Sequence, residues 1–145
     1  MGLDAEMRQA QKLEITRADV RAVAPGETRT CQRVLVVEDD VRVRDLVSRT
    51  LMRRGYVVES VATAETAVEL LQYADPFDLL IADVVLPRMS GADLAAEAHR
   101  MYPHLGILLM SGYSDVKCDG RFIRKPFTPA DLLHEAAGAI RSASS

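Results

Sequence analysis

The sequence predicts an α/β protein whose parallel sheet is doubly wound, with helices on both of its faces. From residue 34 onward, short runs of Val, Ile and Leu alternate with longer amphipathic stretches. Each run is short enough for a buried strand, and each amphipathic stretch has the apolar period of a helix. Strands that alternate with helices pair in parallel through right-handed crossovers, which covers both faces of the sheet.

Five apolar runs are the predicted strands, and turn or helix signals bound each of them. They are residues 34–37, 56–61, 79–82, 107–110 and 122–123. Parallel strands buried on both faces are near-continuous apolar runs of this kind, whereas strands with one wet face alternate apolar and polar residues.

Four amphipathic stretches between and after these runs are the predicted helices. Each places its apolar side chains on one helical face: Val43, Leu46, Val47 and Leu51; Ala64, Ala67, Val68 and Leu71; Leu94, Ala98 and Met101; Leu132, Leu133, Ala136 and Ile140. Thr63, Ser90 and Thr128 are typical residues for helix starts, and Pro129 suits the first helical position. Gly55 is expected to close the first helix.

Composition favours one compact domain. The chain has 145 residues, of which 48% are hydrophobic and 27% charged. A net charge of -3 argues against nonspecific nucleic-acid binding. No segment has the roughly 20 apolar residues of a membrane span, and the first thirty residues lack a signal-peptide core, so we expect a cytoplasmic protein. Cys31 and Cys118 have no metal-ligand spacing and are expected to be reduced thiols.

Residues 1–30 form a separate region in this prediction, a helical extension with a linker, and residues 31–145 form the domain. Helix formers dominate the start, with Leu3, Met7 and Ala10 at heptad-like spacing, and Pro25 with Gly26 interrupts the pattern. Fewer than three heptads are present. A solvated helix and a helix that joins two copies into a homodimer both remain open.

Polar residues with complementary chemistry follow four of the predicted strands. Glu38, Asp39 and Asp40 follow the first strand, and Asp83 follows the third. Ser111 follows the fourth strand, and Lys125 follows the fifth. Because functional groups of such sheets gather at the carboxyl ends of the strands, we expect these side chains to lie together.

This set suits phosphoryl transfer to a carboxylate. Glu38, Asp39 and Asp83 offer the hard oxygen ligands that Mg²⁺ prefers. Asp83 is then the nucleophile, and Lys125 with Ser111 meets the charge on the phosphoryl oxygens. Each residue alone has a simpler alternative, since Asp39 or Asp40 suits a helix cap, Asp83 and Ser111 suit turns, and Lys125 suits the surface.

The segments VLVVEDD, LLIADVVLPRMSG, LLMSGYSD and FIRKPF resemble, in order and roughly in spacing, the receiver domain of two-component response regulators over residues 33 to about 141. The segments GYSD and KPFTP are similar to receivers of hybrid sensor histidine kinases. The resemblance implies a flavodoxin-like sheet of five strands in the order 2-1-3-4-5. It also implies that Asp83 is the phosphoacceptor, that Glu38, Asp39, Asp83 and the Val85 carbonyl hold Mg²⁺, and that Lys125 senses the phosphoryl group. Ser111 is then the switch hydroxyl, Phe122 stands where the family's rotating aromatic sits, and Asp40 keeps the capping role.

The same resemblance implies a function in a phosphorelay. A sensor histidine kinase or a histidine phosphotransfer protein would supply the phosphoryl group from a phosphohistidine. The chain itself lacks a histidine kinase core, so we expect no kinase activity, no DNA-binding output domain and signalling through protein contacts. Lys125 follows Ser111 by only 14 residues, a tract in which receivers usually fit a whole helix with two loops. We therefore expect the fourth helix to be shortened or missing.

Two rival functions remain open. A pseudo-receiver would serve as a docking or dimerisation module without phosphorylation. A small phosphatase of the haloacid dehalogenase type also uses an Asp nucleophile with Lys, a hydroxyl and Mg²⁺, but it needs two aspartates one residue apart after its first strand. Here the nucleophile candidate follows the third strand. Val85 and Tyr113 flank the predicted site, and their bulk is expected to slow hydrolysis of a phosphorylated Asp83.

Overall fold

A computed structural model gives the structure of the chain and describes residues 32–112 and 121–144. The strands are β1 (Arg33–Val37), β2 (Val57–Val61), β3 (Leu79–Asp83), β4 (Gly106–Ser111) and β5 (Arg121–Arg124). The helices are α3 (Val41–Arg53), α4 (Ala64–Tyr73), α5 (Gly91–Met101) and α6 (Pro129–Ser144). All five predicted strands are confirmed, with bounds that differ by one or two residues from the apolar runs.

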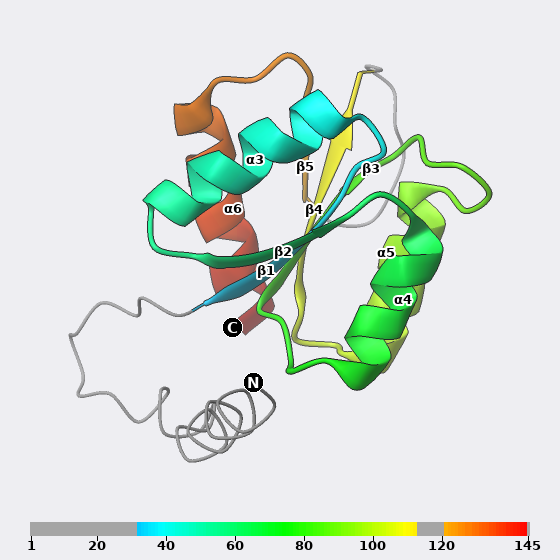
Figure 1. Ribbon diagram of the computed structural model, residues 1–145. Helices are drawn as coiled ribbons and strands as arrows, with labels where there is room; N and C mark the ends of the chain where they lie inside the picture. Colours follow the sequence, from blue (N-terminus) through cyan, green and yellow to red (C-terminus); the bar gives the residue numbers. More distant parts are fainter. Residues whose placement is uncertain (1–31, 113–120, 145) are drawn as a thin grey trace, which may run out of the picture. The chain divides into compact units, whose positions relative to one another are not determined.

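The five strands form one parallel sheet in the order β2-β1-β3-β4-β5. The helices α3 and α6 lie on one side of it, and α4 and α5 lie on the other (Figure 1). This arrangement confirms the doubly wound fold and its strand order. The order reverses direction between β1 and β3, so a crevice at the carboxyl ends of these two strands is the expected place for a site.

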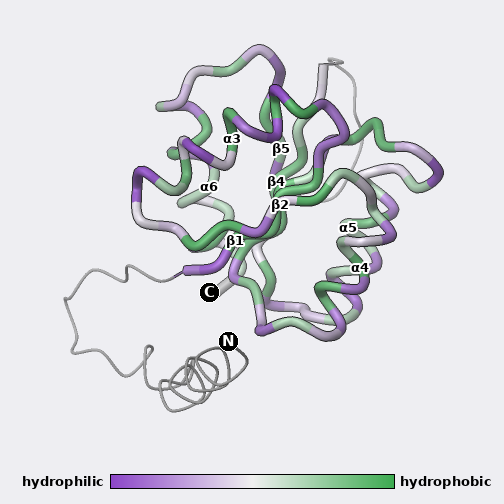
Figure 2. Tube along the Cα trace, in the orientation of Figure 1, coloured by the Kyte–Doolittle hydropathy of each residue, from purple (hydrophilic) through white to green (hydrophobic). Residues whose placement is uncertain are grey.

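The sheet separates two hydrophobic cores. Alternate residues of β1 point to opposite faces, so that Leu35 and Val37 join the core under α4 and α5, whereas Val34 and Val36 join the core under α3 and α6. The central strands are accordingly hydrophobic except at some of their end residues, while the helices alternate in hydropathy (Figure 2). Both cores hold the strand ends in place.

One part of the predicted packing of α3 is wrong. Val47 and Leu51 are fully buried, but Leu46 is 51% exposed, and Thr50 is buried instead. Residues 47 and 51 are one turn apart on the core face, and Leu46 lies about 100° around the helix from Val47, at the edge of that face. The buried Thr50 hydroxyl donates to the Leu46 carbonyl at 2.8 Å, so its burial leaves no polar group unsatisfied.

The predicted helix ends are confirmed in their details. Thr63 and Ser90 cap α4 and α5 by accepting hydrogen bonds from Thr66 N–H and Asp93 N–H. Before α6, Thr128 and Asp131 each accept a backbone N–H bond from the other, at 3.0 and 3.2 Å, which is a reciprocal capping box. Gly55 has a φ of 101° just after α3, a conformation that glycine adopts without strain.

The shortened or missing helix was expected between β4 and β5. Residues 113–120, which include Tyr113 and Cys118, lie outside the described residues, and so do residues 1–31 with the predicted extension and Cys31. Within the described ranges, four helices are present and none follows β4 before β5. None of the helices in the described part is long and apolar enough to cross a membrane.

Candidate functional site

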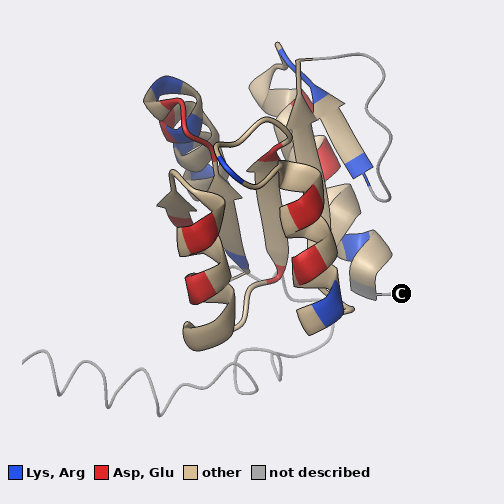
Figure 3. Cartoon of the chain, turned by 90° about the vertical axis from the view of Figure 1, so that its right-hand side faces the viewer, with Lys and Arg blue, Asp and Glu red and all other residues tan. Residues whose placement is uncertain are grey.

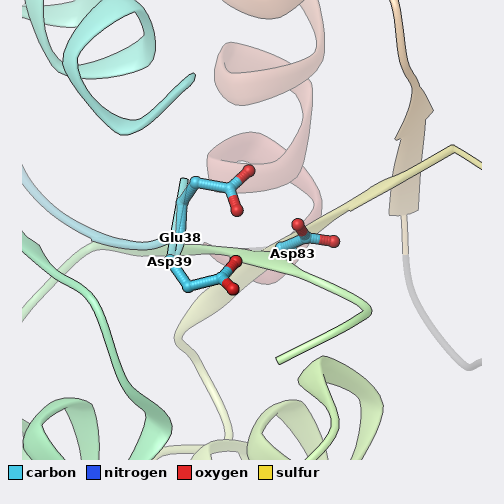
Figure 4. A group of neighbouring side chains, drawn as sticks. All are labelled: Glu38, Asp39 and Asp83. Atoms are coloured by element: carbon cyan, nitrogen blue, oxygen red, sulfur yellow. The ribbon is translucent and has the colours of Figure 1, made fainter. Parts of the chain in front are cut away.

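The three predicted carboxylates meet at the carboxyl ends of β1 and β3. Glu38 and Asp39 follow β1 directly, Asp83 is the last residue of β3, and one oxygen from each lies within 4.8 Å of the others. Figure 4 shows the three side chains turned toward a common space. Glu38 is fully buried and Asp83 is 7% exposed, whereas Asp39 is exposed to solvent.

Lys125 joins this cluster from the end of β5, the edge strand of the sheet. Its Nζ lies 2.7 Å from Glu38 Oε1 and 2.9 Å from Asp83 Oδ2. The residue follows β5 directly, and its backbone N–H donates to the Ser111 carbonyl at 2.7 Å. The backbone bond continues the β4–β5 pairing by one step, so the sheet itself aims the ammonium at the acids.

Burial and mutual interactions shift the pKa values of Glu38 and Lys125. Desolvation of Glu38, together with its interaction with Asp83, raises the pKa of Glu38 to about 7, although Lys125 acts in the opposite direction. Burial alone lowers the pKa of Lys125, but the hydrogen bonds to Glu38 and Asp83 outweigh it and leave that pKa above its ordinary value. The pocket therefore concentrates acidic groups around one lysine, and a bound cation would stabilise their ionised forms.

Backbone contacts hold Asp83 in position. Its Oδ1 accepts the Val85 N–H at 3.0 Å, so that Val85 and Lys125 take different oxygens. Gly91, the first residue of α5, packs against the same turn, because a Cβ built there would lie 2.1 Å from the Asp83 carbonyl oxygen. Gly91 was not singled out from the sequence. The available signal was a glycine, a poor helix former, placed directly after the cap Ser90.

Arg44 and Asp40 hold the other acidic turn. Arg44 donates from Nη1 to the Glu38 carbonyl at 2.8 Å, and Asp40 N–H donates to Glu38 Oε2 at 3.3 Å. Asp40 itself caps α3 by accepting the Arg42 N–H at 2.9 Å, as predicted. The role of Arg44 had no signal in the sequence, since a helical Arg near a strand end is more often an exposed charge.

Ser111 and Phe122 differ in their relation to the cluster. Ser111 is 1% exposed and ends β4 beside the strand that carries Asp83. Phe122 pairs in register with Leu109, is 43% exposed and lies beside α5, away from the carboxylates. Ser111 thus lies at the carboxyl ends of the strands, as predicted. The switch roles of Ser111 and Phe122 stay predictions.

The donor set fits Mg²⁺ in its chemistry. All three candidate ligands are carboxylates, and neither a sulfur nor an imidazole is among them. Magnesium keeps several of its waters, and the exposed Asp39 leaves room for them on the solvent side. The Val85 carbonyl stays a predicted ligand.

Comparison with known proteins defines the class. The family model for the response regulator receiver domain matches residues 34–137. The chain belongs to this family, the receiver domains of two-component systems. A crystal structure of a CheY-like receiver domain protein from Methanospirillum hungatei JF-1 agrees with a TM-score of 0.71 at 29% identity, covering 78% of this chain and 96% of that one.

Two curated relatives differ in size. The response regulator receiver protein CpdR of Brucella abortus (strain 2308) is 35% identical over 112 residues, which are 72% of this chain and 92% of CpdR. The sensor kinase CckA of the same organism is 31% identical over 137 residues, which are 83% of this chain but only 14% of CckA. The chain is therefore similar to a protein of receiver size and to one part of a much larger kinase. Its acidic cluster fits the Mg²⁺ site of such domains.

Proposed function

We propose that this chain accepts a phosphoryl group from a phosphohistidine onto Asp83 and signals through protein contacts. The donor would be a sensor histidine kinase or a histidine phosphotransfer protein, in the cytoplasm. The chain would act without kinase activity of its own. The observation that carries this proposal is the position of the Lys125 ammonium, 2.9 Å from Asp83 Oδ2, where it can meet an incoming anion.

The transfer is a substitution at phosphorus. An Asp83 oxygen attacks, the P–O bond forms, the P–N bond to the imidazole breaks, and the imidazole leaves as it takes up a proton. The Val85 N–H holds Oδ1 of Asp83, which leaves Oδ2, the oxygen bonded to Lys125, as the attacking atom. Lys125 would move its hydrogen bond from the carboxylate to the phosphoryl oxygens, which is a short movement for a flexible side chain.

Glu38, Asp39, Asp83 and the Val85 carbonyl would hold Mg²⁺. The ion, when bound, neutralises the carboxylates and the charge that develops on the phosphoryl oxygens. Glu38 must give up its proton for this, and Asp39 remains accessible to solvent. Ser111 would donate its hydroxyl to the phosphorylated form, and Phe122 would change its orientation in response.

A direct test measures phosphoryl uptake by mass. The full chain is incubated with acetyl phosphate and Mg²⁺, and the intact mass is followed for the parent, Asp83→Asn and the control Asp93→Asn, whose carboxylate lies in the first turn of α5. We expect a phosphate-sized gain in the parent and in the control and none in Asp83→Asn. A parent that stays unmodified would favour the pseudo-receiver.

The phosphatase alternative has less support. Its nucleophile belongs after the first strand, whereas Asp83 ends β3. Release of inorganic phosphate from a phosphomonoester such as p-nitrophenyl phosphate, lost in Asp83→Asn, would restore that alternative.

A further inference from the structure

A groove of about 1040 Å³ lies beside β5, outside the carboxylate cluster. One wall is α5, the floor includes Ile107 of β4 and Phe122 of β5, and the last turns of α6 close one end with Ala139. Figure 3, in which α4 and α5 face the viewer, shows no helix in front of β5 among the described residues. Phe122, an aromatic residue of a parallel strand, is 43% exposed, so none of the described helices covers this face.

The wall of the groove has the shape that a second helix requires. Ala92, Ala95 and Ala96 line it from α5, at the spacing of neighbours on one helical face. Small side chains let two helix axes approach to about 8 Å, the lower end of the usual distance. The floor beneath them is apolar and offers no buried polar group to fix a metabolite, so large apolar side chains from another helix suit it better than a small polar ligand.

The charged side chains that line the groove are both basic. They are Arg100 and Arg121, and no acidic side chain is among the lining residues. Among the described residues, Arg100 pairs with Glu97, and Arg121 pairs with Glu135 at 3.6 Å; neither acid lines the groove. Exposed pairs of this kind contribute at most about 1 kcal/mol, so an incoming carboxylate competes with them at little cost.

We propose that this groove docks an amphipathic helix of a partner protein. The apolar face of that helix packs on the alanines of α5 and on Phe122, and Asp or Glu residues on its flank pair with Arg100 and Arg121. Such docking uses a surface distinct from the carboxylate cluster, and the unphosphorylated chain already presents it. The partner is thus defined by its chemistry, an acidic helix with large apolar residues at positions i, i+3, i+4 and i+7.

The test uses two synthetic helical peptides with the same apolar face, one flanked by Glu and one flanked by Lys. Each is titrated into the ¹⁵N-labelled full chain, and backbone amide shifts are followed. We expect the Glu peptide to shift the amides of α5 and β5 and to bind at least about tenfold more tightly than the Lys peptide, as electrostatic complementarity predicts. The same shifts are expected in Asp83→Asn, so a failure of the phosphoacceptor proposal leaves this result unchanged.

Variants locate the binding surface. Ala96 is exposed, so Ala96→Glu keeps the core intact while it adds bulk and negative charge inside the groove. This variant and Arg121→Glu should weaken binding of the Glu peptide at least about tenfold. Gln72→Glu, which matches the charge change of Ala96→Glu on the exposed side of α4, should not. Circular dichroism confirms the fold of each variant.

Three results would overturn the inference. They are no shifts with either peptide at millimolar concentration, shifts confined to other elements, or unchanged binding in Ala96→Glu. Sedimentation without peptide tests a further occupant. If the parent has a mass above that of the monomer and Ala96→Glu has the mass of the monomer, the groove binds a second copy of this chain instead.

Discussion

The Lys125 ammonium lies 2.7 Å from Glu38 Oε1, although the two residues are 87 positions apart in the chain. Glu38 is fully buried, and the same ammonium also bonds to Asp83, so one cation balances acids from two adjacent strands. The contact forms only when β1, β3 and β5 take their places in one sheet. It therefore reports the assembled fold and sets the charge state of the pocket.

Removal of this cation should destabilise the fold. In metal-free buffer near neutral pH, we expect Lys125→Met to lower the free energy of unfolding by about 1–3 kcal/mol, because two buried carboxylates lose their counter-charge. The loss should shrink at acidic pH, where Glu38 takes up a proton. Urea unfolding measures it. The control is Arg49→Met, which breaks the exposed pair with Asp45 and should change stability by less than about 0.5 kcal/mol.

Magnesium affinity should depend on pH through Glu38. The pKa of Glu38 in the folded state is about 7, above the ordinary 4.5, so between these values the folded state binds a proton that the unfolded state has released. The stability of the metal-free protein therefore falls as the pH rises from 4.5 to 7. A metal ion needs the carboxylate form of Glu38. The Mg²⁺ affinity measured by titration calorimetry should therefore fall as the pH drops below about 7. Glu38→Gln should bind more weakly and lose most of this dependence. Equal affinity of the parent on both sides of that pH would contradict the assignment.

Gly91 should tolerate no side chain. A Cβ there would lie 2.1 Å from the Asp83 carbonyl oxygen, which is backbone and cannot rotate away. We expect Gly91→Ala to cost about 1–3 kcal/mol of stability and to reduce phosphoryl uptake. Gly138→Ala is the matched control, since its Cβ meets only the flexible end of the Arg121 side chain. It should be neutral or stabilise α6, so equal effects at both sites would refute the close packing at Gly91.

Val85 should slow the loss of a phosphoryl group from Asp83. Its side chain is 58% exposed two residues after Asp83 and can cover the acyl phosphate. We expect Val85→Asn to speed hydrolysis about two- to tenfold, because water reaches the acyl phosphate more easily. A tenfold change lowers the activation free energy by about 1.4 kcal/mol. The decay of the phosphorylated mass measures this. Val57→Asn, at the distant start of β2, serves as control, and an unchanged rate in Val85→Asn counts against shielding.

The sheet was predictable because parallel strands with two covered faces must be apolar throughout. The apolar runs located all five strands, but β5 extends beyond its apolar pair to Arg121 and Arg124, because backbone pairing with β4 sets its length. Leu46 was assigned to the wrong side of α3, since helical periodicity alone does not say where the edge of a core face lies. Tertiary packing decides that.

The candidate site was predictable in its acids and its lysine, because strand ends of one sheet meet at one edge. Arg44 and Gly91 were not, since both act on backbone carbonyls of turns whose path follows from the assembled fold. No spacing rule connects a helix residue to a carbonyl of the preceding strand end. Such supporting contacts depend on the path that both turns take in the folded protein.

The short border strand β5 has a further consequence for solubility. Its four residues begin and end with arginine, and its outer side faces no further strand in the described residues. Brevity and flanking positive charge are devices by which natural sheets discourage sideways addition of another chain. Replacement of both arginines by threonine should therefore make concentrated protein prone to fibrils that bind thioflavin, even though neither residue belongs to a core.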